Sequence, residues 1–148
     1  MNLRSLFLLL LSIFLLSCDN DDYPYAKVPS VVRNAFWTQY PDAADAKFIQ
    51  MDQNYEVEFE INEEDGSAVV SPSGNIVKEK REIEWNDLPA GVQETLRKTY
   101  GQKKIEDPER VRIGEEIHYQ VEVSRFFIDE EIVLNAAGKI DTNLNYWK

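Results

Sequence analysis

The fold is indicated by a stretch that occurs twice, first as Val28-Pro29-Ser30-Val31-Val32 and, sixty positions later, as Leu88-Pro89-Ala90-Gly91-Val92. Each copy opens a segment in which apolar residues recur every four positions, which is the spacing of one face of an α-helix. A proline suits the first turn of a helix, because an N–H there has no intrahelical partner. The sequence therefore predicts two equivalent helices, which end near Tyr40-Pro41 and Tyr100-Gly101.

Strands are predicted after each helix. Over residues 55–61, Tyr, Val, Phe and Ile alternate with glutamates, which is the period of a half-buried antiparallel strand, and residues 119–124 alternate likewise. The first copy is further expected to contain a hairpin turn at Glu63-Glu64-Asp65-Gly66 and strands over 67–71 and 76–85. The second copy is expected to contain strands over 125–128 and 131–135 around Asp129-Glu130, and a last strand over 139–147.

The repeated pattern predicts an α+β fold made of two tandem α-β-β-β(-β) repeats. A unit of about 60 residues buries little surface by itself, so the two halves are expected to share one antiparallel sheet with both helices on one face. The predicted organisation is a signal peptide over 1–17, an acidic tether over 18–27, a first repeat over 28–87 and a second repeat over 88–148.

The N-terminus has the features of a bacterial lipoprotein signal. Arg4 precedes an apolar run over Leu6–Leu16, which is shorter than the roughly 20 residues of a membrane-spanning helix. The run ends in Leu15-Leu16-Ser17-Cys18, which resembles a lipobox, and the Asp-rich residues that follow resemble the export signal of surface lipoproteins in Bacteroides-type bacteria. We expect lipid attachment at Cys18 and a place in the bacterial cell envelope, at the outer membrane, in the periplasm or on the surface. The alternative is an ordinary secretory signal.

Charge and cysteine content exclude several classes of function. The chain has 27 Asp and Glu against 16 Lys and Arg, a net charge of −11, which argues against nucleic acid as a partner. A single cysteine excludes a disulfide framework and a cysteine-rich zinc site. Contact with a membrane is expected only through the lipid anchor.

No constellation of catalytic residues is apparent, so we expect no enzyme and no cofactor. His118 is the only histidine, no Gly-x-Ser-x-Gly motif occurs, and the only cysteine is the expected lipid site. His118 is interpreted as an exposed strand residue. A calcium loop aligned on Gly66 would begin at Ile61 and end at Pro72, and one that begins at Asp141 has Tyr146 in place of glycine. No dedicated metal site is therefore predicted.

The order of these elements resembles that of a known family. The pattern extends over nearly all of residues 27–148. The first repeat has the order Val-Pro, helix, Tyr-Pro, Tyr-x-Val-x-Phe, Ser-Gly-x-Ile. The second has the order Leu-Pro, helix, Tyr, Tyr-x-Val, Gly-Lys-Ile. This succession is similar to that of the PepSY-like family of secreted or lipid-anchored two-repeat proteins, which are related in fold to β-lactamase inhibitory protein. The resemblance implies a binding or inhibitory protein that grips its partner with an open sheet face, and it places a peptidase among the candidate partners.

The expected binding surface is the sheet face without helices. Its predicted residues are Glu56, Glu58, Glu60 and Glu122, with Trp37 as a candidate contact on the helix side. A basic protein or peptide would be attracted to these glutamates, although they could equally keep an exposed sheet soluble. A second hypothesis is a small-ligand or calcium sensor that uses the acidic turns Glu63–Asp65 and Asp129–Glu131. Trp85 and Trp147 end equivalent last strands and are interpreted as caps of the core.

Overall fold

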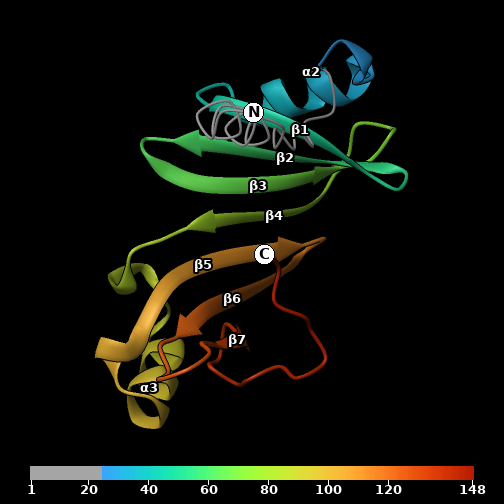
Figure 1. The fold of residues 1–148 in the computed structure, drawn as a ribbon. Helices are drawn as coiled ribbons and strands as arrows, with labels where there is room; N and C mark the ends of the chain where they lie inside the picture. The colour runs from blue at the N-terminus through green and yellow to red at the C-terminus, as the bar shows by residue number, and fades with distance from the viewer. Residues whose placement is uncertain (1–24) are drawn as a thin grey trace, which may run out of the picture.

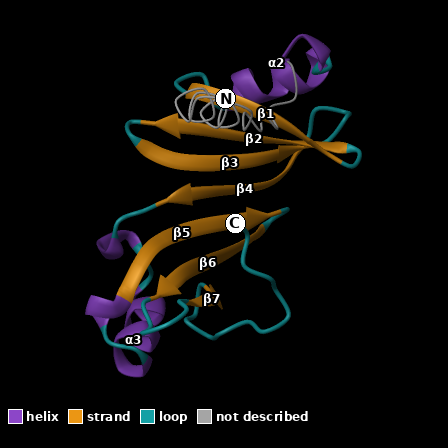
Figure 2. Cartoon of the chain, in the orientation of Figure 1, coloured by secondary structure: helices purple, strands orange, loops and turns teal. Residues whose placement is uncertain are grey.

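The chain forms one antiparallel sheet with helices at opposite ends (Figures 1 and 2). The computed structural model describes residues 25–148. The sheet has seven strands in the order of the sequence, and each pairs only with its neighbours. The longer elements are α2 (Ser30–Gln39), β1 (Ala44–Met51), β2 (Asn54–Ile61), β3 (Glu64–Val70), β4 (Ile76–Glu82), α3 (Ala90–Thr99), β5 (Ile105–Ile113), β6 (Glu116–Val123) and β7 (Glu130–Asn135). Single 3-10 turns lie at Tyr25–Lys27, Trp85–Asp87 and Gln102–Lys104.

The predicted α+β fold of two repeats on a shared sheet is confirmed. The first repeat supplies α2 and β1 to β4, the second supplies α3 and β5 to β7, and β4 pairs with β5 between them. Both predicted helices form, and each is preceded by its proline as the N-cap residue. Their apolar stripes are buried, as the period of four predicts.

Each helix covers its own apolar core on the same face of the sheet. The first core is formed by Val28, Val32, Phe36, Tyr40, Phe48, Tyr55, Val57, Phe59, Ala68 and Val70. The second is formed by Leu88, Val92, Leu96, Tyr119, Val121, Val123, Ile132 and Leu134. The strand register places both sets on one face, since Phe59, Gly66, Arg81, Arg110 and Tyr119 follow one another across the sheet.

Between the two cores, this face carries charged side chains on β4 and β5. Glu79 accepts a hydrogen bond from Arg112 Nε at 2.9 Å and another from the Tyr40 hydroxyl, and Arg110 Nη1 lies 3.9 Å away. Burial raises the pKa of Glu79, but the hydrogen bonds from Arg112 and Tyr40 outweigh burial and lower it.

Glu79 is expected to make stability fall with acidification. Because its pKa is lower in the folded state, its contribution is present above the unfolded value of about 4.3 and is lost as the pH falls through the folded value. The Glu79→Gln variant should therefore lose less stability than the wild type between pH 7 and about pH 3. Urea unfolding at both pH values checks this, and equal losses in the two proteins would contradict it.

Several predicted elements are wrong in position. The first hairpin turn lies at Asn62 and Glu63, which both adopt positive φ (56° and 68°), so Asp65 and Gly66 belong to β3. A Cβ at Gly66 would lie 2.8 Å from Arg81 Cδ and 3.1 Å from the Phe59 ring, so glycine leaves room for these two side chains. The predicted strand over 76–85 ends at Glu82 and is followed by a 3-10 turn.

In the second repeat, residues 125–128 form a loop, and β7 starts at Glu130 within the predicted turn. The predicted last strand over 139–147 is reduced to one bridge, between Ile140 and Leu134. Beyond this bridge the chain leaves the sheet edge and runs back across the sheet, so that its C-terminus lies in front of β5 (Figure 1).

The sequence pattern does not indicate the first strand of each repeat. Both β1 and β5 contain a bulge at which an aspartate, Asp45 or Asp107, adopts positive φ (50° and 45°). An extra residue at a bulge shifts the alternation of side chains, so neither strand shows a regular period of two.

Candidate functional site

The candidate site is the sheet face opposite the helices, called the open face below. Strand register identifies its members, because residues that pair across neighbouring strands point to the same side. One row across the sheet runs through Lys47, Glu58, Ser67, Lys80, Val111, His118 and Asn135. By the same register the four predicted glutamates, Glu56, Glu58, Glu60 and Glu122, all lie on this face.

The centre of the open face is covered by the C-terminal segment. The main chain of Trp147 pairs with the side-chain amide of Gln120, whose Oε1 accepts from Trp147 N at 3.1 Å and whose Nε2 donates to Trp147 O at 2.7 Å. Lys80 Nζ donates to the same carbonyl at 3.1 Å. Gln120 is only 1% exposed, so this pairing is a buried polar contact that fixes the position of the segment.

The Trp147 indole is held by groups of both charges. Its Nε1 donates to Glu56 Oε1 at 2.8 Å, and Lys78 Nζ lies 4.1 Å from the ring centroid. Lys80 lies over the same ring at 5.6 Å, which adds a second cation–π contact. Burial lowers the pKa of Lys78, with Glu56 opposing the effect.

Two neighbouring hollows lie beside the end of this segment, with volumes of about 380 and 470 Å³. Both are lined by Asp65, Lys80, Glu109 and Lys148. The charged residues that line the first hollow in addition are Asp45, Lys47, Glu58 and Glu60. The second is lined in addition by Glu82, Asp107, Glu122 and Tyr146. The pKa of the Tyr146 phenol is raised, mainly by burial. The negative charges of the surrounding carboxylates, of which Glu109 and Glu122 have the largest effect, raise it further. The hollows are therefore acidic.

Cations within the described chain balance only part of this charge. Lys80 pairs with Glu109 at 2.9 Å, and Lys47 lies 4.0 Å from Glu58. Lys148 Nζ pairs with Glu131 at 2.7 Å. Across residues 25–148 no ion pair is formed by the other carboxylates of the hollows, namely Asp45, Glu60, Asp65, Glu82, Asp107 and Glu122.

The predicted residues divide into two groups. Glu58, Glu60 and Glu122 line the acidic hollows, whereas Glu56 is only 8% exposed because it lies beneath Trp147. The interpretation of Trp147 as a core cap is wrong, since its indole contacts the open face. The sequence analysis also did not identify Lys78 and Lys80 as residues of the open face. Their spacing of two along β4 could have indicated that they point to the same side of the sheet.

His118 differs in its surroundings from its interpretation, whereas Trp37 lies on the helix side as expected. His118 does lie on the open face, but it is buried, and Glu116 Oε2 lies 3.4 Å from its Nε2. Trp37, which is 36% exposed, lies on α2 and donates from Nε1 to the Tyr25 hydroxyl at 3.2 Å. Trp85 packs against the second core as expected.

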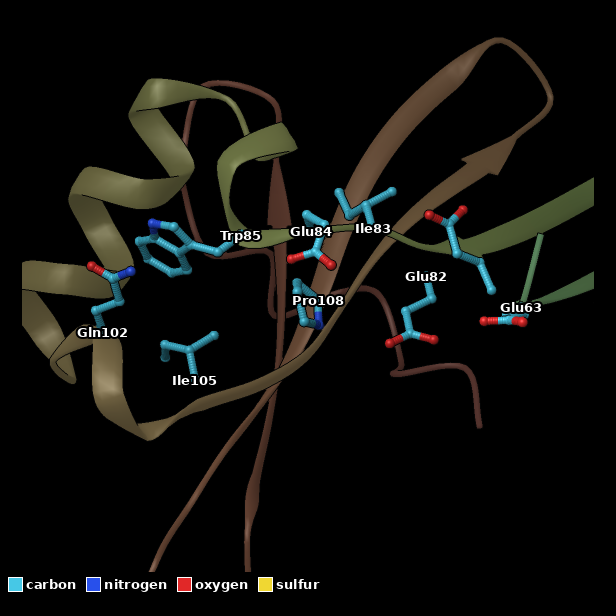
Figure 3. A pocket seen from close by; sticks show the side chains of 9 residues that line it. Glu63, Glu82, Ile83, Glu84, Trp85, Gln102, Ile105 and Pro108 are labelled. Carbon is cyan, nitrogen blue, oxygen red and sulfur yellow. The ribbon is translucent and has the colours of Figure 1, made fainter. Parts of the chain in front are cut away.

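A separate hollow of about 390 Å³ lies at the junction of the repeats (Figure 3). Glu63 and Glu82 lie at one end, and Trp85, Gln102 and Ile105 lie at the other.

Within residues 25–148, no group of three or more His, Cys, Asp or Glu side chains is arranged to hold a metal ion. At the other acidic turn, Asp129 Oδ1 accepts from the Arg125 N–H at 3.0 Å, and Glu130 pairs with the Arg125 guanidinium.

The loop between β6 and β7 presents three apolar side chains to solvent. Phe126, Phe127 and Ile128 are 90%, 89% and 82% exposed. The two phenyl rings meet edge to face with centroids 4.7 Å apart. Arg125 holds the base of the loop through its bonds to Asp129 and Glu130.

Replacing all three apolar residues of this loop with serine is expected to change the free energy of unfolding by less than about 1 kcal/mol, because they bury little surface. Denaturant unfolding measures this, with Arg125→Ala as a comparison that removes the Glu130 ion pair. A loss above about 2 kcal/mol in the triple variant would show that the three side chains pack in solution.

The expected signal peptide and the lipid site at Cys18 lie outside the described residues. In the described part of the chain, no helix has the length and apolar character needed to span a membrane.

Comparisons with known proteins agree with the two-repeat fold. A model of the family described as "Putative beta-lactamase-inhibitor-like, PepSY-like" matches the chain twice, over residues 15–78 and 71–142. No curated protein matches the chain.

Three Bacteroides proteins of known structure are similar. A "putative periplasmic" protein from Bacteroides eggerthii has a TM-score of 0.69 and 19% identity, with 76% of this chain and 85% of that chain covered. A DUF2874 family protein from Bacteroides uniformis has a TM-score of 0.67, 18% identity and the same coverage. A BLIP-like protein from Bacteroides fragilis has a TM-score of 0.66 and 16% identity, with 79% and 85% covered. At these identities the likeness concerns the fold alone.

Proposed function

Because the chain belongs to the PepSY-like family, whose description is that of an inhibitor-like protein, we propose that it is a non-enzymatic binding or inhibitory module of the bacterial cell envelope. It binds a protein or peptide through the open face. An envelope or secreted peptidase is the candidate partner that the family description favours.

The observation that carries this proposal is the unbalanced acidity of the open face. Both helices pack on the opposite face, so the hollows lined by Glu58, Glu60 and Glu122 are free of covering secondary structure. Carboxylates gathered in a hollow concentrate negative potential there and attract a basic partner. The partner surface is therefore basic.

The proposed location is the envelope, with a lipid anchor at Cys18. Support comes from the signal-like sequence over 1–17 and from the "putative periplasmic" description of the Bacteroides eggerthii protein. An acylated cysteine would hold the domain at a bilayer without a spanning helix.

The proposal is tested by photocrosslinking in envelope extract of the cell that makes the protein. A photoreactive residue replaces Glu58 on the open face, or Glu94 on the exposed side of α3 as a control. We expect a discrete adduct from position 58 only, which mass spectrometry identifies. Purified partner then confirms the interaction.

Charge reversal on the open face tests whether the adduct depends on the acidic residues. Glu60→Lys with Glu122→Lys should lower the yield at position 58 by about tenfold or more, because two attractive charges become repulsive. The matched control, Asp87→Lys with Glu94→Lys, makes the same change of charge at or beside α3 and should leave the yield intact. No adduct, or one that only the control reversal removes, would refute the proposal.

A further inference from the structure

The segment Tyr146–Lys148 is recognised on the open face in the manner of a bound peptide. Gln120 pairs with both main-chain groups of Trp147, which recognises a peptide without regard to its side chain. Glu56 and Lys78 recognise the indole, which adds a preference for an aromatic residue. Main-chain pairing joined to a side-chain contact is the usual basis of peptide recognition by a sheet.

Lys148 completes this resemblance to a ligand. It lines both acidic hollows, and its ammonium pairs with Glu131. The chain thus places a basic residue of its own where the electrostatics of the open face favour a cation. An aromatic residue followed by lysine is the pair of side chains that this surface accommodates.

The sheet also has an unfilled place for the residues that precede this segment. In the first repeat, β4 pairs along β3 from Ile76 to Arg81, whereas the equivalent segment of the second repeat forms a single bridge at Ile140. The outer edge of β7 therefore lacks the strand that, by analogy with β4 in the first repeat, would pair with it. When Tyr146–Lys148 is displaced, the residues that precede it can pair there instead of remaining in solvent.

We infer that Tyr146–Lys148 is a displaceable occupant of a peptide site, and that the external ligand is a peptide with an aromatic residue next to a lysine or arginine. This inference rests on the proposed function of the open face, and it specifies the chemistry of the partner. Binding of the partner exchanges one segment for another on Gln120, Glu56 and Lys78.

The experiment uses a fluorescein-labelled synthetic peptide with the sequence of residues 141–148 as probe, followed by anisotropy. In the wild type, the tethered copy competes at an effective concentration in the millimolar range. Trp147→Ala vacates the indole site, so this variant should bind the probe about tenfold or more tightly than the wild type does. Phe127→Ala, which removes an exposed aromatic residue from the loop between β6 and β7, should bind it as the wild type does.

A second probe with alanine in place of tryptophan should bind none of the three proteins. Equal affinity of the first probe for wild type and Trp147→Ala, or equal binding of both probes, would overturn the inference. If Trp147→Ala fails to fold, the wild type is labelled with 5-fluorotryptophan. Excess unlabelled peptide should then shift the ¹⁹F resonance of Trp147 and leave those of Trp37 and Trp85 in place, and an unmoved Trp147 resonance overturns the inference.

The two proposals fail separately. An envelope adduct at position 58 that charge reversal removes, together with probes that do not discriminate, supports the binding function and refutes the displaceable segment. Discriminating probes without any envelope adduct support the peptide site and refute the envelope partner.

Discussion

Replacing Phe36 with alanine is expected to lower the free energy of unfolding by about 3 to 5 kcal/mol. Phe36 is fully buried at the centre of the first core. Its ring lies within 5.0 to 5.5 Å, centroid to centroid, of Trp37, Tyr40, Phe48 and Phe59. Removing the ring deletes all four contacts at once and leaves a cavity that neighbouring side chains on rigid strands cannot fill.

The comparison variant is Trp37→Ala, one position along the same helix. Trp37 is larger than Phe36, but it is 36% exposed and its hydrogen bond to Tyr25 is at the surface. Its loss should cost no more than about half as much as the loss of Phe36. Urea unfolding of the two variants at pH 7 measures the difference, and equal losses would contradict the central place of Phe36.

Gly138→Ala is expected to be as damaging as Phe36→Ala, for a different reason. Gly138 has a φ of +81°, which costs an alanine about 1 to 2 kcal/mol. A Cβ at this position would also lie 2.1 Å from the carbonyl oxygen of Gly91 in α3. Backbone must move to relieve that overlap, and overpacking adds about 1 to 3 kcal/mol. The expected total is about 2 to 5 kcal/mol.

Alanine variants at two other glycines distinguish the cost of the positive φ from the cost of the steric overlap. Gly101 has a φ of +86°, and a Cβ there would meet no atom within 4 Å, so Gly101→Ala measures the conformational cost alone. Gly74, the counterpart of Gly138 in the first repeat, would place its Cβ at 3.1 Å from a Val31 methyl group. Thermal unfolding should rank Gly138→Ala as the most destabilised of the three. A loss equal to that of Gly101→Ala would show that the contact with Gly91 relaxes freely.

The helices and the alternating strands could be predicted because their periods are local. Val32 and Phe36 in one copy, and Val92 and Leu96 in the other, are four residues apart and fully buried. By contrast, β1 and β5 are interrupted by bulges at Asp45 and Asp107. A bulge is stabilised by the partner strand, so nothing within the segment itself indicates it.

The candidate site could be predicted only in part, for a similar reason. The alternation of Glu58 and Glu60 on β2 fixed their face. The position of Trp147 depends on Gln120, 27 residues away, and on Glu56, 91 residues away. Its correspondence to Trp85 indicated a core residue, and only the long-range contacts decide between the two positions.

The two apolar cores share no side chain, and the only sheet connection between them within residues 25–148 is the pairing of β4 with β5. Cooperativity carried by the sheet must therefore pass through this one pair of strands. Hydrogen bonds in such a structure open in separate blocks when the coupling is weaker than the stability of each block. Amide exchange in the second half can thus proceed while the first stays closed, and the C-terminal segment, which contacts β2, β4 and β6, is the additional link that ties them together.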